Sequence, residues 1–336
     1  MPYVVQSTEG LRQSASEMET KALLYLMTCR DDSDDIYYFI VDFFNDLTGA
    51  DRMAGRLWDV QSKGASGSSP KAIGKELVTL FKNFLSDFEF SFFILFLGGV
   101  SGSVRIDNTK TCFPISNIRE VAVKKIVEGL KEESYEKIYI DNNSITDDNI
   151  TAFLQKVYFV IDDKTKEEYI KSIIRINPMI MPDDLVFVGI FNEIRNKQAS
   201  KKNESRIEGR ILNYPREAIH YCRHLTKSEI KLLVLNRIIN WNVIGRGVPL
   251  SFIPIYNQFP PQEQRDRLED CYLGLSKALF NRNHSDDFWA LFENIYGAIV
   301  TYPSYSVEQI FENLDQQLVN RCYDFDVLSL EYFIAI

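Results

Sequence analysis

Three polar residues on either side of one turn-like run combine oxygen ligands with a positive charge. Asp46 precedes the run, which extends from Gly49 to Gly55, and Gln61 and Lys63 follow it. Carboxylate and carboxamide oxygens are hard ligands of the kind that Mg²⁺ prefers. An ammonium group stabilises negative charge that develops on a phosphate. These residue types are therefore suited to binding a divalent cation beside a phosphate group.

A predicted strand over residues 56–63 must position two of these residues. Side chains alternate along a strand, so Asp59, Gln61 and Lys63 lie on one face. The midpoint between Asp46 and Gln61 falls inside the turn-like run, and a hairpin there brings them almost opposite each other in the middle of a sheet. The alternative interpretation is a strand that ends in an exposed lysine and an aspartate that belongs to an ordinary turn.

A second carboxylate lies on the first predicted helix, residues 10–29. Apolar residues recur around Glu19 at helical spacing, so Glu19 lies among apolar neighbours. Either its carboxylate reaches water at the edge of the apolar face, or it points inward as a second metal ligand beside Asp46. Asp59 is the other candidate for this additional acid.

The elements around the hairpin alternate between strands and helices. Residues 36–48 are rich in β-branched and aromatic side chains but show no turn, so one bent strand and two strands both remain open. Pro70 to Ser86 is a predicted helix capped by Ser69, and residues 90–97 form a strand that is apolar on both faces. This order predicts an α/β fold around one mixed sheet.

The rest of the chain becomes mostly helical toward its C-terminus. Short strands are predicted at residues 135–140 and 158–161. The polar run 197–206, with mixed charges, is predicted to be a mobile loop or linker. Helices are predicted at residues 117–131, 147–155, 164–174, 182–196, 226–240, 262–281, 285–300 and 306–322.

The net charge of −9 over 336 residues argues against a protein that binds nucleic acid with its whole surface. A local basic groove remains compatible with this charge.

The five cysteines form no Cys-x-x-Cys pair, which argues against a disulfide framework and fits a reducing cytosol. The N-terminus lacks the pattern of a signal peptide, and the longest apolar run, residues 88–100, is too short to cross a bilayer. The chain is therefore predicted to be cytoplasmic and not bound to a membrane.

Two further patterns carry weaker predictions. His220 and His224 stand four residues apart on a predicted helix, but no third zinc ligand accompanies them, so a zinc site is not favoured. Residues 98–102, Gly-Gly-Val-Ser-Gly, follow a strand but lack the lysine of a phosphate-binding loop and are interpreted as a turn.

Asp46 together with Gln61-Ser62-Lys63 resembles the motif of the PD-(D/E)xK restriction-endonuclease-like superfamily. The order helix, three strands, helix, strand is similar to the core of that superfamily. Gln61 departs from the usual Asp or Glu and resembles the QxK variant in the double-stranded DNA endonuclease domain of bacterial anti-phage effectors of the CBASS and Lamassu type. The resemblance covers residues 8–100 best.

This resemblance implies a metal-dependent endonuclease that cleaves DNA phosphodiester bonds in bacterial anti-phage defence. Asp46, Gln61 and Lys63 would be the catalytic residues, and Glu19, Asp46 and Gln61 would hold Mg²⁺ or Mn²⁺. It also implies a restriction-endonuclease-like core at residues 1–115. A mixed α/β extension at 116–225 and a helical C-terminal region at 226–336 are predicted to follow.

The implied partners are double-stranded DNA and a separate helicase or ATPase subunit, and a homo-oligomer is compatible with the sequence. The alternative function is a non-catalytic scaffold or interaction subunit of such a complex. In that case the apolar and aromatic surface of the helical C-terminal region would bind the partner.

Overall fold

The computed structural model describes residues 3–5, 17–174, 182–202, 206–240, 242, 247–281 and 283–336. The chain divides into two compact units. The first unit comprises residues 1–169 and 191–227, and the second comprises residues 170–190 and 228–336. The three segments predicted from the sequence, with boundaries after residues 115 and 225, stay a prediction.

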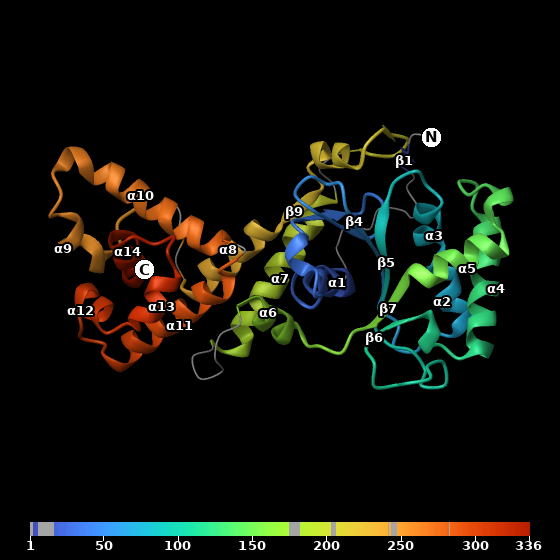
Figure 1. Ribbon diagram of the computed structural model, residues 1–336, viewed down its shortest axis with the longest axis horizontal. Helices are drawn as coiled ribbons and strands as arrows, with labels where there is room; N and C mark the ends of the chain where they lie inside the picture. Colours follow the sequence, from blue (N-terminus) through green and yellow to red (C-terminus); the bar gives the residue numbers. More distant parts are fainter. Residues whose placement is uncertain are drawn as a thin grey trace. The chain divides into compact units, whose positions relative to one another are not determined.

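The described part of the first unit is built on a mixed sheet of seven strands (Figure 1). Strands β4, β5 and β7 run parallel to one another, and the other neighbours pair antiparallel. The predicted α/β class with a mixed sheet is therefore confirmed. In spatial order the strands are β6 (Cys112–Pro114), β7 (Val157–Ile161), β5 (Phe90–Leu97), β4 (Leu57–Lys63), β3 (Leu47–Ala50), β2 (Tyr38–Val41) and β9 (His224–Thr226). A separate antiparallel pair joins β1 (Tyr3–Val4) to β8 (Ile211–Leu212).

Helices cover both faces of this sheet, which explains why β5 is apolar on both sides. Trp58 of β4 donates a hydrogen bond to Asp32, which follows helix α1 (Glu17–Thr28). The next residue, Asp59, accepts one from Asn83 of α3 (Val78–Phe84). Because neighbouring side chains of a strand point to opposite faces, α1 and α3 lie on opposite faces of the sheet.

The predicted hairpin between Asp46 and Gln61 is confirmed. Strands β3 and β4 pair antiparallel with Leu47 opposite Val60. Asp46 lies one residue before Leu47, and Gln61 lies one residue after Val60. The two candidate site residues therefore come together at the same end of the β3–β4 ladder.

The question left open for residues 36–48 is answered by a second hairpin. Strands β2 and β3 pair antiparallel, with Val41 opposite Leu47, and the loop 42–46 reverses the chain. Asp42 takes a positive φ of 49° in this loop, and its N–H donates to the carbonyl of Asp46. Two short strands replace the single long one because Asp42 adopts a left-handed conformation that a strand does not allow.

One predicted helix and one predicted strand differ from the elements in the structure. The predicted helix over residues 70–86 is divided into α2 (Pro70–Glu76) and α3, and Ser69 caps α2 as predicted. The predicted strand at residues 135–140 is wrong, because its first residues belong to α4 (Glu120–Glu136). Tyr135 and Ile138 are exposed and Ile140 alone of residues 135–140 is buried, so this apolar run lacks the continuous buried face that a strand in the sheet would need.

The polar run 197–206 was predicted as a loop, and this prediction is wrong for residues 197–201. Helix α7 (Asp184–Lys201) continues through them. Gln198 and Lys202 are buried, so the polarity of the run comes partly from side chains that pair inside the protein. Residues 203–205, like residues 10–16 of the first predicted helix, lie outside the described residues.

The second unit is helical in its described residues, as predicted for the C-terminal region. The predicted helix 306–322 is two helices, and a further helix ends the chain. No helix among the described residues is long and apolar enough to cross a membrane.

The remaining α-helices of the described chain, in both units, are α5 (Asp147–Lys156), α6 (Lys166–Ile174), α8 (Lys227–Ile238), α9 (Ile253–Tyr256), α10 (Pro261–Phe280), α11 (Ser285–Thr301), α12 (Val307–Glu312), α13 (Gln316–Arg321) and α14 (Val327–Ala335).

Candidate active site

The carboxylate of Asp46 is held by the strand that the hairpin brings beside it. Its Oδ2 accepts hydrogen bonds from Gln61 Nε2 at 2.9 Å, from the backbone N–H of Ser62 at 3.0 Å and from Ser62 Oγ at 3.1 Å. All three of these bonds go to the same oxygen. Among the described residues none donates a hydrogen bond to Oδ1, while the other oxygen of the carboxylate is fixed by β4.

Burial raises the pKa of Asp46 to about 6. The hydrogen bond from the Ser62 backbone opposes this rise, the negative charge of Glu19 adds to it, and the positive charge of Lys63 opposes it. The charges of Glu19 and Lys63 thus act on the Asp46 carboxyl with opposite signs. A cation bound at this carboxylate would remove the electrostatic cost of keeping it charged.

Lys63 pairs with an acid that sequence reasoning did not identify. Its Nζ lies 3.1 Å from Glu76 Oε2, and both side chains are about one-third exposed. Glu76 is the last residue of α2, the helix that follows the β4 strand. The spacing of thirteen residues between them gave no signal, because only the tertiary fold brings the last residue of α2 to the lysine at the end of β4.

The side chain of Glu19 points inward and is nearly buried, so its carboxylate does not simply reach water at the edge of the apolar face. Its Oε2 lies 2.8 Å from Nζ of Lys202, which directly follows α7. Lys202 was placed in a predicted loop and was not a candidate site residue. Glu19 thus contributes negative charge to the surroundings of Asp46 and is itself paired with Lys202.

Asp59 belongs to a different group of polar residues. It is fully buried and accepts bonds from Asn83 Nδ2 at 2.6 Å and from Thr48 Oγ1 at 3.4 Å. Burial raises its pKa to about 7, although the bond from Asn83 and the charge of Lys82 oppose the rise. These contacts assign Asp59 to the packing between the sheet and α3, so its proposed substitution for Glu19 or Asp46 has no support.

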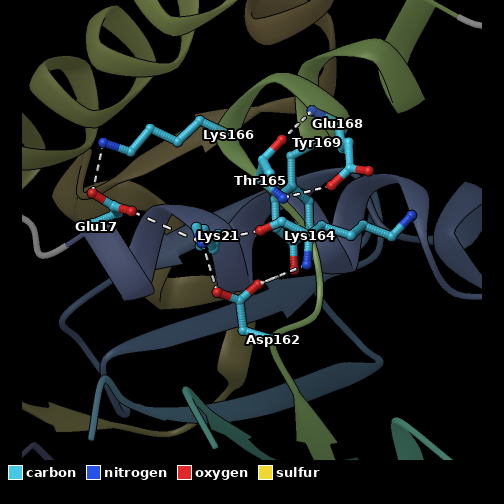
Figure 2. A network of polar contacts seen from close by, with 8 residues as sticks. All are labelled: Glu17, Lys21, Asp162, Lys164, Thr165, Lys166, Glu168 and Tyr169. Atoms are coloured by element: carbon cyan, nitrogen blue, oxygen red, sulfur yellow. Dashed lines mark hydrogen bonds and ion pairs between the residues drawn. The ribbon is translucent and has the colours of Figure 1, made fainter. Parts of the chain in front are cut away.

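Helix α1, which carries Glu19, is fastened to the chain after β7 by the polar network in Figure 2. Lys21 Nζ contacts Asp162 Oδ2 at 2.6 Å and donates to the carbonyl of Lys164 at 3.0 Å. The other oxygen of Asp162 accepts from the hydroxyl of Tyr169 at 3.0 Å. These contacts fix α1 two residues beyond Glu19 and so fix the position of that acid.

The loops after β4 and β5 approach each other closely beside this site. A Cβ atom added to Gly98 would lie 2.7 Å from the carbonyl oxygen of Gly64. Only glycine allows this approach, which gives the Gly98–Gly102 run a structural reason independent of phosphate binding. Lys63 lies at the carboxyl end of a parallel strand, the edge where open α/β sheets bind ligands.

The donor set fits a magnesium ion. Mg²⁺ in proteins is held by one or two carboxylates and keeps several waters. Asp46 and Glu19 supply two carboxylates, and Gln61 supplies a carboxamide oxygen that its bond to Asp46 leaves available. Within the described residues no group of three or more His, Cys, Asp or Glu side chains that could hold a metal ion is found.

The histidine pair does not provide an alternative metal centre. His220 lies in a 3₁₀ helix and His224 in β9, with Cys222 in a left-handed conformation between them. The spacing predicts that the two histidines lie on one face of a helix, and this prediction is wrong.

Comparisons with protein-family models, with curated proteins and with solved structures gave no match.

Proposed function

We propose that the first unit is a metal-dependent endonuclease that hydrolyses DNA phosphodiester bonds, on a restriction-endonuclease-like core. One observation carries the proposal: Gln61 and Ser62 hold one oxygen of Asp46 while the other accepts no hydrogen bond from a described residue, with Lys63 on the same strand. This arrangement presents an oxygen ligand and a nearby cation at the edge of a sheet.

In this proposal Asp46, with Gln61 and Glu19, holds Mg²⁺ or Mn²⁺. The bound cation would polarise the phosphate and lower the pKa of an attacking water. Gln61 and Ser62 keep the Asp46 carboxylate in one orientation, so the ligand needs little rearrangement.

Lys63 would stabilise negative charge on the phosphate. Its ion pair with Glu76 keeps the ammonium at the end of β4. Both groups are about one-third exposed, so the pair leaves the ammonium accessible to a substrate. An anionic phosphate then competes with Glu76 for the same cation.

The DNA must overcome the charge of −9 on the whole chain. Long-range repulsion weakens association with a polyanion, and a local basic groove or a basic partner would offset it. The resemblance of Asp46 and Gln61-Ser62-Lys63 to the nuclease motif adds a separate helicase or ATPase subunit of a bacterial defence system to the proposal as the partner.

The test is cleavage of a supercoiled plasmid by purified protein with Mg²⁺ or Mn²⁺. Asp46→Asn and Lys63→Ala should each reduce cleavage at least about a hundredfold, by analogy with the loss of one stabilising group in other active sites. Lys124→Ala removes an exposed lysine of α4 and is the control, which should keep full activity. No cleavage by the wild-type protein, alone or with a partner ATPase, would favour the non-catalytic scaffold instead.

A further inference from the structure

Lys202 is a buried lysine beside an acid of the proposed metal site. Its side chain is 6% exposed and that of Glu19 is 12% exposed, and their charged atoms are 2.8 Å apart. One turn earlier in α7, Gln198 is fully buried and accepts a hydrogen bond from Thr20 Oγ1 at 2.9 Å. Gln198 of α7 and Lys202, which directly follows this helix, therefore contact two successive residues of α1.

The ion pair between Lys202 and Glu19 has an electrostatic effect in addition to its contribution to packing. An ammonium group is costly to bury and is kept charged in the interior by an acid that pairs with it. The acid in this case is Glu19, whose negative charge also raises the pKa of Asp46. Lys202 thus neutralises one of two carboxylates that lie close enough to interact.

A divalent cation that used both carboxylates would compete with this ammonium. Glu19 in contact with Lys202 is already neutralised, and a metal ion at Glu19 would repel a lysine held beside it. We propose that Lys202 is the internal counter-ion of the metal site, which holds Glu19 until a divalent cation displaces it. The inference rests on the proposed function for the identity of the site, but concerns metal binding and not cleavage.

The first test measures Mn²⁺ binding to the full chain by electron paramagnetic resonance. Lys202→Met should bind Mn²⁺ about tenfold more tightly than wild type, given the coupling energies of close charge pairs. Lys197→Met, an exposed lysine on the same helix, should leave the affinity unchanged. Adding Glu19→Gln to Lys202→Met should abolish the gain, since the gain requires the released carboxylate.

Unchanged or weaker Mn²⁺ binding by Lys202→Met would overturn the proposal, as would a gain that persists in the double variant. Circular dichroism verifies that each variant is folded. The readout here is Mn²⁺ binding and not cleavage. A chain that binds Mn²⁺ as expected but cuts no plasmid in the separate cleavage assay therefore refutes the nuclease and leaves this inference standing.

A second measurement uses the wild-type protein and does not depend on the folding of a variant. Lysine acetylation with an activated ester, quantified by mass spectrometry, should show Lys202 protected without metal and several-fold more reactive with saturating Mn²⁺. Lys197 is the internal control and should react equally in both conditions. Equal protection of Lys202 with and without Mn²⁺ would overturn the proposed displacement.

Discussion

The buried carboxyl of Asp59 should make the first unit lose stability as the pH rises toward neutrality. Its pKa is about 7 in the folded protein because of burial, against about 4 for an unfolded chain. The folded state therefore keeps a proton that the unfolded state releases between these values. Stability is greatest below the unfolded pKa and falls by about 1.4 kcal/mol per pH unit up to the folded pKa. Integrated from pH 5 to pH 7, the loss from this group is about 2 kcal/mol.

Asp59→Asn removes the titration and keeps the shape of the side chain. The new amide oxygen can accept the bond from Asn83, and the new amide nitrogen can donate to the hydroxyl of Thr48. We expect the difference in free energy of unfolding between pH 5 and pH 7 to be about 2 kcal/mol smaller than in wild type. Asp148→Asn, at an exposed position of α5, should not change the difference.

The assay must report on the first unit alone, because the two units have separate cores. Hydrogen exchange of peptides from β4, followed through a urea series at pH 5, 6 and 7 without metal, gives the free energy of that unit. The reasoning would be refuted if Asp59→Asn had the same pH dependence as wild type. Relative to wild type, Asp59→Asn should lose more stability at pH 5 than at pH 7. At pH 5 the wild-type protein is stabilised by a neutral buried acid that the variant lacks.

Two other predictions follow from the contacts of the first unit. Because the pKa of Asp46 is about 6 through burial, protons should compete with Mn²⁺, and the affinity should fall about tenfold from pH 7 to pH 5. Electron paramagnetic resonance titrations measure this, and an affinity independent of pH would contradict the role of Asp46 as a ligand. Gly74→Ala should destabilise the protein by about 1–3 kcal/mol, since the added Cβ would overlap the carbonyl of Ile126 in α4. Gly67→Ala, where the added Cβ meets nothing within 4 Å, is the control, and equal melting temperatures for the two variants would refute the overlap.

Local pattern was sufficient to predict the hairpin and the pairing of Asp46 with Gln61. Strand periodicity identified β4, and the turn residues fixed where the chain reverses. In an antiparallel hairpin the register follows from the length of the turn, so two residues at equal distances from it must meet. The Ser69 cap was predictable for the same reason, because a cap depends on residues only a few positions apart.

Composition was misleading where polar side chains pair inside the protein. The run 197–206 looked like a solvated loop because it is rich in charge, but its first half is helical and carries Gln198 and Lys202 to α1. The single sequence held no sign of these partners, which lie on the first helix of the chain. Glu76 was missed for a related reason, since it approaches Lys63 only through the packing of α2.

The sequence by itself determined which chemical groups stand on either side of the β3–β4 turn and that they would meet. Only the tertiary structure decided that Glu19 is paired with Lys202 and that Asp59 belongs to a separate cluster. It also decided the pKa values of Asp46 and Asp59. The physical reason is that pairing within a hairpin depends on distance along the chain, whereas burial and charge interactions depend on distances in space between remote segments.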